Sequence, residues 1–180
     1  RKDSIIAANN RRPTVKSLVS DEDAPLLSAL KAKRRALSEQ QKIPAYIVFN
    51  DKTLIEMAEK RPKSLDEMAS VGGVGAKKLE RYGQAFLSVV TGEEHKIHPT
   101  RRKIAGLPEA EVFDQLLISQ RILERGDSRT EKLLSCSRTT LRNIAKVRPQ
   151  NLDKLGQIPG MNDARTERFG KAFIEILQSL

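Results

Sequence analysis

Three glycines and two lysines lie within seven consecutive residues, from Gly72 to Lys78. Glycines at the start of a helix let backbone N–H groups approach an anion closely, and the helix N-terminus adds a partial positive charge. Lys77 and Arg81 are four residues apart, so their like charges repel mildly unless an anion lies between them. The run therefore predicts a phosphate contact, with a glycine turn between solvated lysines as the alternative. The expected contact residues are Gly73, Gly75, Lys77, Lys78 and Arg81.

Tyr46 is a second candidate for binding chemistry, within the apolar segment from Ala45 to Phe49. An aromatic ring beside cations can stack on a nucleobase, which contributes roughly 1–3 kcal/mol per base. The alternative is a core tyrosine whose hydroxyl finds a partner at the edge, and the apolar composition of the segment favours it. Because the chain offers no partner strand, we expect this segment to be a tight, buried connection and not a strand.

Residue types that are typical of catalysis lack the spacing that catalysis requires. The sequence contains no GxxxxGK[ST] loop, no CxxC pair, no HExxH and no nucleophile elbow. His95 and His98 have no acidic or thiol partner at a recognised spacing, so we expect them to be exposed to solvent. Cys136 is the only cysteine and is expected to be a small core residue. We therefore expect no catalytic residue, no metal site and no cofactor within this chain.

The elements that must position these residues occur twice, because the chain nearly repeats itself at an offset of 87 residues. Thr53-Leu54 recurs as Thr140-Leu141, and Glu80-Arg81 recurs as Glu167-Arg168. One unbroken register indicates two copies of one small fold. The expected divisions are a polar basic linker over 1–22, a first domain over 23–92, a flexible basic linker over 93–106 and a second domain over 107–180.

Apolar residues at spacings of three and four predict an all-α fold, with four or five short helices in each copy. Asn50 or Asp51 should cap the second of these helices, and Ser64 with Glu67 forms a capping box for the third. Gly92 should end the last helix of the first copy. The expected core of the second copy comprises Leu116, Leu117, Leu141, Ile144, Leu152, Leu155, Phe169, Phe173, Ile176 and Leu180.

The first helix of the chain combines an apolar stripe with a basic back. Leu26, Leu30 and Leu37 share one face, and Leu27 lies at its edge. The cations on the back and flanks of this helix are Lys31, Lys33, Arg34 and Arg35. We expect these four side chains to add to a phosphate-binding surface.

Composition points toward an anionic partner. The net charge is +10, which makes nucleic acid the first partner to test, with a merely lysine-rich solvated surface as the alternative. No apolar stretch approaches the roughly 20 residues that cross a bilayer, so we expect a soluble, cytoplasmic protein with no membrane partner. The first residue is Arg1, which suggests a piece of a longer polypeptide.

The segment from Ile43 to Phe86 closely resembles the helicase-and-RNase-D C-terminal (HRDC) domain of bacterial RecQ-type DNA helicases. The strings IVFNDKTLIEMA and GVGAKKLERYG carry the resemblance, and the second copy resembles the same family more weakly, as in a tandem of such domains. The resemblance implies a small helical bundle without a catalytic centre, and a contact with single-stranded or branched DNA during recombination and repair. It also implies that Tyr46 takes part in that contact.

The second copy departs from this pattern at the candidate site. Gly75 and Lys77 are replaced by Asn162 and Ala164, and Tyr46 is replaced by Leu133. We therefore expect the second domain to dock on a helicase core or a repair protein as readily as on DNA. An accessory domain of an RNase D-like exonuclease is a further alternative. We expect a monomer associated with the nucleoid, and we expect ATP and Mg²⁺ to bind only in the motor of a longer helicase.

Overall fold

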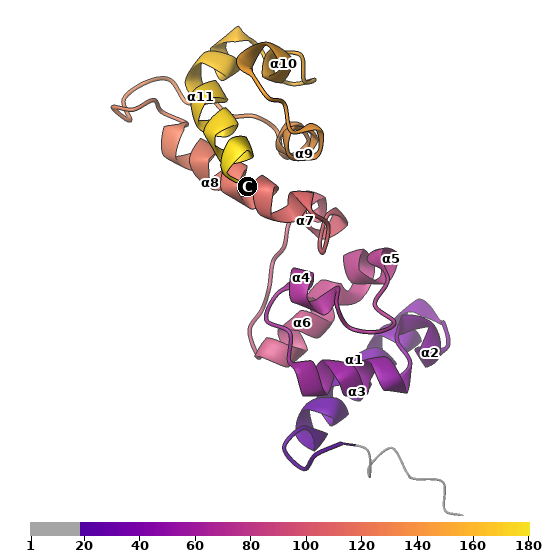
Figure 1. Ribbon diagram of the computed structural model, residues 1–180. Helices are drawn as coiled ribbons and strands as arrows, with labels where there is room; N and C mark the ends of the chain where they lie inside the picture. The colour runs from indigo at the N-terminus through magenta and orange to yellow at the C-terminus, as the bar shows by residue number, and fades with distance from the viewer. Residues whose placement is uncertain (1–18) are drawn as a thin grey trace, which may run out of the picture.

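The structure is a computed structural model that describes residues 19–180. The first unit contains α1 (Ala24–Gln41), α2 (Ala45–Val48), α3 (Asp51–Lys60), α4 (Leu65–Met68), α5 (Ala76–Lys78), η2 (Leu79–Gly83) and α6 (Gln84–Thr91). After α7 (Pro99–Lys103), the second unit contains α8 (Glu109–Leu123), α9 (Arg138–Val147), α10 (Leu152–Gly156) and α11 (Asp163–Ser179). No strand occurs within the described residues, and Figure 1 shows two helical bundles with α7 between them. The predicted all-α fold is confirmed.

The helix ends repeat between the two units because the capping residues do. The side chain of Asn50 accepts a hydrogen bond from the backbone N–H of Thr53 at the start of α3, and Ser137 caps α9 in the same way. Ser64 caps α4, as predicted, and Asn151 caps α10. Each of these side chains satisfies an N–H group that has no acceptor within its helix.

Each bundle encloses its own hydrophobic core. In the first, Phe49 and Phe86 are fully buried and meet edge to face, with 4.9 Å between ring centroids. In the second, Phe169 and Phe173 stack at 5.5 Å. Aromatic pairs in these geometries stabilise a core beyond the area that they bury.

The buried face of the first helix is wider than predicted. Leu30 is buried as expected, Leu27 is buried as well although it was placed at the edge of the face, and Leu26 and Leu37 are partly buried against the core. The face is wide because α1 packs against α2, α3 and α6 together.

Two predicted core positions of the second unit are wrong. Leu152 and Leu180 are 47% and 51% exposed, and Leu177 fills the core position near the end of α11 in place of Leu180. Leu180 lies beyond the last helical turn, so no neighbouring helix covers it. The other predicted positions are buried or pack against the core.

The segment from Ala45 to Phe49 contains a single helical turn, α2, and is not a strand. Val48 and Phe49 are buried, which anchors the turn, while Tyr46 and Ile47 are 68% and 43% exposed. The predicted buried connection is therefore correct for the second half of the segment only. Within one helical turn, the first two of these side chains, Tyr46 and Ile47, lie on the side opposite Val48 and Phe49, so Tyr46 faces away from the core.

The segment expected as a flexible linker over 93–106 is folded in its second half. Ile104 is buried in the second core, whereas the next residue, Ala105, is buried in the first. Arg101 of α7 donates hydrogen bonds to Asp66 of the first unit and to Asp114 of the second. Residues 99–105 are therefore not flexible as expected, because one buried residue and one ion pair attach them to each of the two units.

The polar linker predicted over 1–22 lies mostly outside the described residues. Its last residues form a turn in which the backbone N–H of Asp23 donates to the carbonyl of Ser20. Arg61 donates to the carboxylate of Asp23 at 2.9 Å and to the carbonyl of Glu22 at 3.1 Å. This end of the segment is thereby attached to the first bundle.

Candidate nucleic-acid interface

Tyr46 presents its ring to solvent at the side of the first bundle. It is 68% exposed, the largest exposed fraction among the exposed large apolar side chains within residues 19–180. The neighbouring Ile47 is also exposed, and the buried Val48 and Phe49 fix the turn that carries both. A core role for Tyr46 is excluded by this exposure, and the ring is available for stacking.

Phe49 connects this turn to the helix that follows the glycine run. Its ring is 6.1 Å from the ring of Tyr82 in an edge-on arrangement, and the Nζ atom of Lys78 lies 5.7 Å from its centroid. The segment that carries Tyr46 and the helix that carries the lysine pair therefore contact the same buried ring.

Gln41, at the end of α1, is a site residue that sequence reasoning missed. Its Oε1 atom accepts a hydrogen bond from Arg81 at 2.6 Å and another from the hydroxyl of Tyr82 at 2.9 Å. Arg81 also lies over the ring of Tyr82, 5.3 Å from its centroid. The local sequence around Gln41 contains no signal for this role, because its partners are some forty residues away.

Four of the predicted cations have no carboxylate partner within the described part of the chain. They are Lys33, Lys77, Lys78 and Arg81. The only polar partner of Arg81 there is the neutral amide of Gln41, so the positive charge is oriented and not neutralised. Lys77, Lys78 and Arg81 lie within five consecutive residues, and like charges at this spacing favour an anion from outside the protein.

The other three cations of α1 have carboxylate partners, although all four were expected to add to a phosphate-binding surface. Arg34 donates to the carbonyl of Phe49 at 2.9 Å and pairs with Asp51 at 2.7 Å, and its side chain is only 14% exposed. Lys31 approaches the same carboxylate at 3.9 Å, and Arg35 pairs with Glu39 at 2.8 Å. Arg34 thus fixes the junction between α2 and α3 and is removed from the candidate phosphate ligands.

The glycines of the run have different physical roles. Gly73 has a φ of +85°, and an added Cβ would collide with the hydroxyl of Thr53. Gly75 is the N-cap of α5, with a φ of −77° and no atom near the position of a Cβ. Glycine is therefore required at position 73 by the backbone conformation and by the contact with Thr53. At position 75, neither the backbone conformation nor the packing requires glycine. Open space before an uncapped helix start is what close backbone contact with an anion needs.

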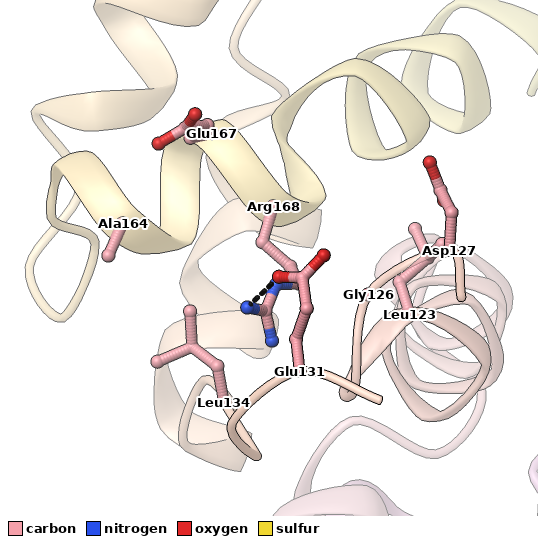
Figure 2. Close-up of a pocket in the computed structure, with 8 residues that line it drawn as sticks. All are labelled: Leu123, Gly126, Asp127, Glu131, Leu134, Ala164, Glu167 and Arg168. Atoms are coloured by element: carbon pink, nitrogen blue, oxygen red, sulfur yellow. Dashed lines mark hydrogen bonds and ion pairs between the residues drawn. The ribbon is translucent and has the colours of Figure 1, made fainter. Parts of the chain in front are cut away.

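The second unit uses the equivalent cations within its own fold. Arg165 donates to the carbonyls of Ser135 and Gly160, both at 2.8 Å. Arg168 donates to the carbonyls of Glu124 and Lys132 and pairs with Glu131 at 2.6 Å, beside an open cavity of about 300 Å³ (Figure 2). These arginines hold the segment that replaces α2 and are not displayed for a ligand.

The remaining reactive residues have structural partners. His98 accepts a hydrogen bond from the N–H of Thr100 at the start of α7, and a ring nitrogen of His95 lies 2.8 Å from the hydroxyl of Thr91. His98 is exposed as predicted, but His95 is only half-exposed because of this contact. Cys136 is buried as predicted, and burial raises the pKa of its thiol to about 11. The described residues contain no cluster of side chains suited to a metal ion.

No helix among residues 19–180 is both long enough and apolar enough to span a membrane.

Comparison with known proteins gives a consistent family assignment. The sequence model of the HRDC domain family matches residues 23–90 and 134–177. The ATP-dependent DNA helicase RecQ of Haemophilus influenzae is 45% identical over 93 residues, which cover 52% of this chain and 14% of that protein. The RecQ helicase of Pasteurella multocida is 41% identical over 78 residues, covering 43% of this chain and 12% of that protein. The matches therefore span only a small part of these relatives.

Two further similarities each cover about two fifths of this chain. The ATP-dependent DNA helicase UvrD2 of Mycobacterium tuberculosis (strain H37Rv) is 42% identical over 73 residues, covering 41% of this chain and 10% of that protein. The solved structure described as D. radiodurans RecQ HRDC domain 3 is 35% identical, with a TM-score of 0.39, covering 40% of this chain and 95% of that chain.

Proposed function

The chain belongs to the HRDC domain family, and we propose on this premise that it is a non-catalytic DNA-binding segment of a RecQ-type DNA helicase. Its first unit would contact single-stranded or branched DNA through the ring of Tyr46 and the cations Lys77, Lys78 and Arg81. The observation that carries the proposal is the exposed ring of Tyr46 in the same short segment as Phe49, whose ring lies 5.7 Å from the Nζ atom of Lys78. Lys77, Lys78 and Arg81 have no carboxylate partner among residues 19–180. Base stacking and phosphate contacts together are how sequence-tolerant single-strand binding works.

Each part of the site would make one kind of contact. Lys77 and Lys78 would meet phosphates at the start of α5, where the uncapped helix and the open position at Gly75 admit the DNA backbone. Arg81, oriented by Gln41, would bind a further phosphate, and Lys33 would extend the positive surface along α1. Tyr46 would stack on one base. Because charge dominates such binding, affinity would fall steeply as salt rises.

The curated relatives are named as DNA helicases, which favours DNA over RNA and a helicase over an RNase D-like exonuclease as the whole protein. ATP and Mg²⁺ would bind in the motor of that helicase and not in this chain, whose sequence lacks a phosphate-binding loop motif. Within the helicase, this segment would hold DNA near the motor. The role in recombination and repair is part of the same proposal.

The test is fluorescence-anisotropy titration of labelled single-stranded and forked DNA at several salt concentrations. We expect Tyr46→Ala to weaken binding by roughly 5- to 150-fold, the loss of one stacked base, with an unchanged salt slope. The double variant Lys77→Ala/Lys78→Ala should reduce the slope of log K against log salt by about 1.4, since each phosphate contact contributes about 0.7 on single strands.

The matched control removes two exposed lysines from the second unit, as Lys146→Ala/Lys171→Ala, which changes the net charge equally. Leu133→Ala is the control for Tyr46, because the two residues occupy equivalent positions and both are exposed. These controls should change affinity by less than about threefold. Equal losses in the control and site variants would show that the charge of the chain, and not this site, binds DNA.

A further inference from the structure

In the first unit, a lysine at the end of α3 connects this helix to the segment that follows α4. The Nζ atom of Lys60 pairs with Glu56, one turn earlier, at 2.7 Å and donates to the carbonyl of Ser70 at 3.3 Å. The hydrogen bond from Lys60 is the largest cause of the lowered pKa of Glu56. The bridge therefore spans from α3 to the segment that follows α4, with one charge of each sign.

The second unit lacks this bridge and has an open groove at the equivalent place. Asn143 and Val147 of α9 occupy the positions of Glu56 and Lys60. Val147 is 65% exposed and lines a groove of about 710 Å³, together with apolar residues from the segments on either side of α10. Those apolar residues are Pro149, Ile158 and Pro159.

This region is also more positive in the second unit than in the first. Lys154 lines the groove where the first unit has Glu67, and Arg148, which keeps the charge of the equivalent Arg61, lines it at the end of α9. No carboxylate is among the lining residues, and neither cation has an ion pair within residues 19–180. The groove thus combines an apolar surface with two unpaired positive charges.

We propose that this groove binds a short acidic segment of a partner protein, in which an apolar side chain lies next to one or two carboxylates. The apolar side chain would pack against Val147, Pro149 and Ile158, and the carboxylates would pair with Arg148 and Lys154. The volume accommodates a few residues, within the range of sites that bury most of a small ligand. This function is separate from the DNA contact proposed for the first unit.

The chemistry of the groove favours a peptide over the other available partners. Its lining contains no aromatic ring on which a base could stack, whereas aliphatic and proline side chains match an aliphatic partner. A second copy of this chain is disfavoured, because each copy carries a net charge of +10 and complementary potentials promote association. Carboxylates beside an apolar anchor complement both features of the groove.

The test is selection from a phage-displayed library of random heptapeptides on the whole 180-residue chain, at moderate salt. Counter-selection uses the variant Asn143→Glu/Val147→Lys, which transplants the bridge of the first unit into α9. A Glu four residues before a Lys is a favourable helix pair, so this variant should fold normally. We expect enriched peptides with at least one carboxylate next to a leucine, isoleucine or phenylalanine.

Synthetic peptides from the selection are then measured by fluorescence polarisation and by methyl NMR of Val147 and Ile158. We expect binding to the bridge variant to be at least tenfold weaker, and binding to Lys154→Glu at least about fivefold weaker. Both variants should keep the DNA affinity of the unsubstituted chain. The proposal would be overturned if every selected peptide bound the bridge variant as tightly as the unsubstituted chain, or if the enriched peptides lacked carboxylates. Displacement of the peptide by single-stranded DNA from these same methyl groups would assign the groove to nucleic acid instead.

Discussion

Arg81 and Arg168 show how one residue type takes different roles at equivalent positions. Arg81 is exposed, and the amide of Gln41 orients it without neutralising its charge. The side chain of Arg168 is only 15% exposed, and it supplies donors to two carbonyl groups and to Glu131. The number of internal hydrogen bonds, and not the residue type, therefore determines whether an arginine is available to a ligand.

Alanine substitution should separate these two roles. We expect Arg168→Ala to lower the free energy of unfolding by about 1–3 kcal/mol and to leave DNA affinity unchanged. The substitution removes the donor of the Lys132 carbonyl, one of two donors to the Glu124 carbonyl, and the ion pair with Glu131. Arg81→Ala should change stability by less than about 0.5 kcal/mol and should reduce the salt slope of DNA binding by about 0.7. Urea unfolding and anisotropy titration measure the two effects. The reverse pattern would place the DNA contact in the second unit.

At the scale of elements, the glycine run joins a structural turn to an uncapped helix start. Thr53 donates to the carbonyl of Gly72, and Gly73 turns the chain with a positive φ, as Gly160 does in the second unit at +93°. The units differ at the following N-cap, where Asn162 accepts a hydrogen bond from the N–H of Arg165, while Gly75 offers no side chain. The turn is shared, and only the first unit leaves its helix start open.

The substitution Gly75→Asn should therefore separate stability from binding. An Asn at this N-cap is expected to hold or slightly raise the free energy of unfolding, by up to about 0.5 kcal/mol, because it caps the helix as Asn162 does. The same side chain should occupy the N–H group of Lys78 and weaken DNA binding at least threefold, since a phosphate can no longer reach it. Thermal unfolding and DNA titration of this variant give the two numbers. A stabilised variant with unchanged DNA affinity would show that the backbone at Gly75 makes no contact.

At the scale of the whole molecule, one arginine connects the two bundles. Arg101 contacts Asp66 of α4 and Asp114 of α8, and its side chain is only 16% exposed. Asp66 also accepts a hydrogen bond from the backbone N–H of Gly106 at 2.6 Å. Burial alone would raise the pKa of Asp66, but the hydrogen bonds from Arg101 and Gly106 and the charge of Arg101 outweigh it and lower the pKa.

The connection through Asp66 should depend on pH in a defined direction. Because the folded pKa of Asp66 lies below its unfolded value of 3.8, the stabilisation is fully present above pH 3.8 and is lost as the pH falls through the folded pKa. Asp66→Asn should thus lower the free energy of unfolding by about 1 kcal/mol at pH 7, a value already reduced for partial exposure. The difference from the unsubstituted chain should shrink below pH 3.8. Urea unfolding from pH 7 to pH 2.5 measures it, with Asp153→Asn as control, an exposed position that has no ion pair among residues 19–180. A difference that is constant over this range would refute the assignment.

Much of the fold was predictable because its determinants are local. Apolar spacing of three and four, and caps such as Asn50 and Ser64, act within a few residues of the chain. The offset of 87 residues then indicated the duplication, and the strings around Tyr46 and Lys77 indicated the family. Leu152 and Leu180 were wrongly assigned to the core. They lie at the start of α10 and after the last turn of α11, and apolar periodicity does not predict where a neighbouring helix ceases to cover such positions.

The sequence by itself determined that this is a basic, duplicated, all-α chain of the HRDC family, since periodicity, capping and register are properties of neighbouring residues. Only the tertiary structure decided which cations face solvent, that Tyr46 is exposed, and that Arg101 joins the units. The partners of Arg101 and Arg81 lie 35 and 40 residues away, at Asp66 and Gln41. Hydrogen bonds and charges over such separations form only when packing brings the helices together, so chemically identical residues acquire different roles.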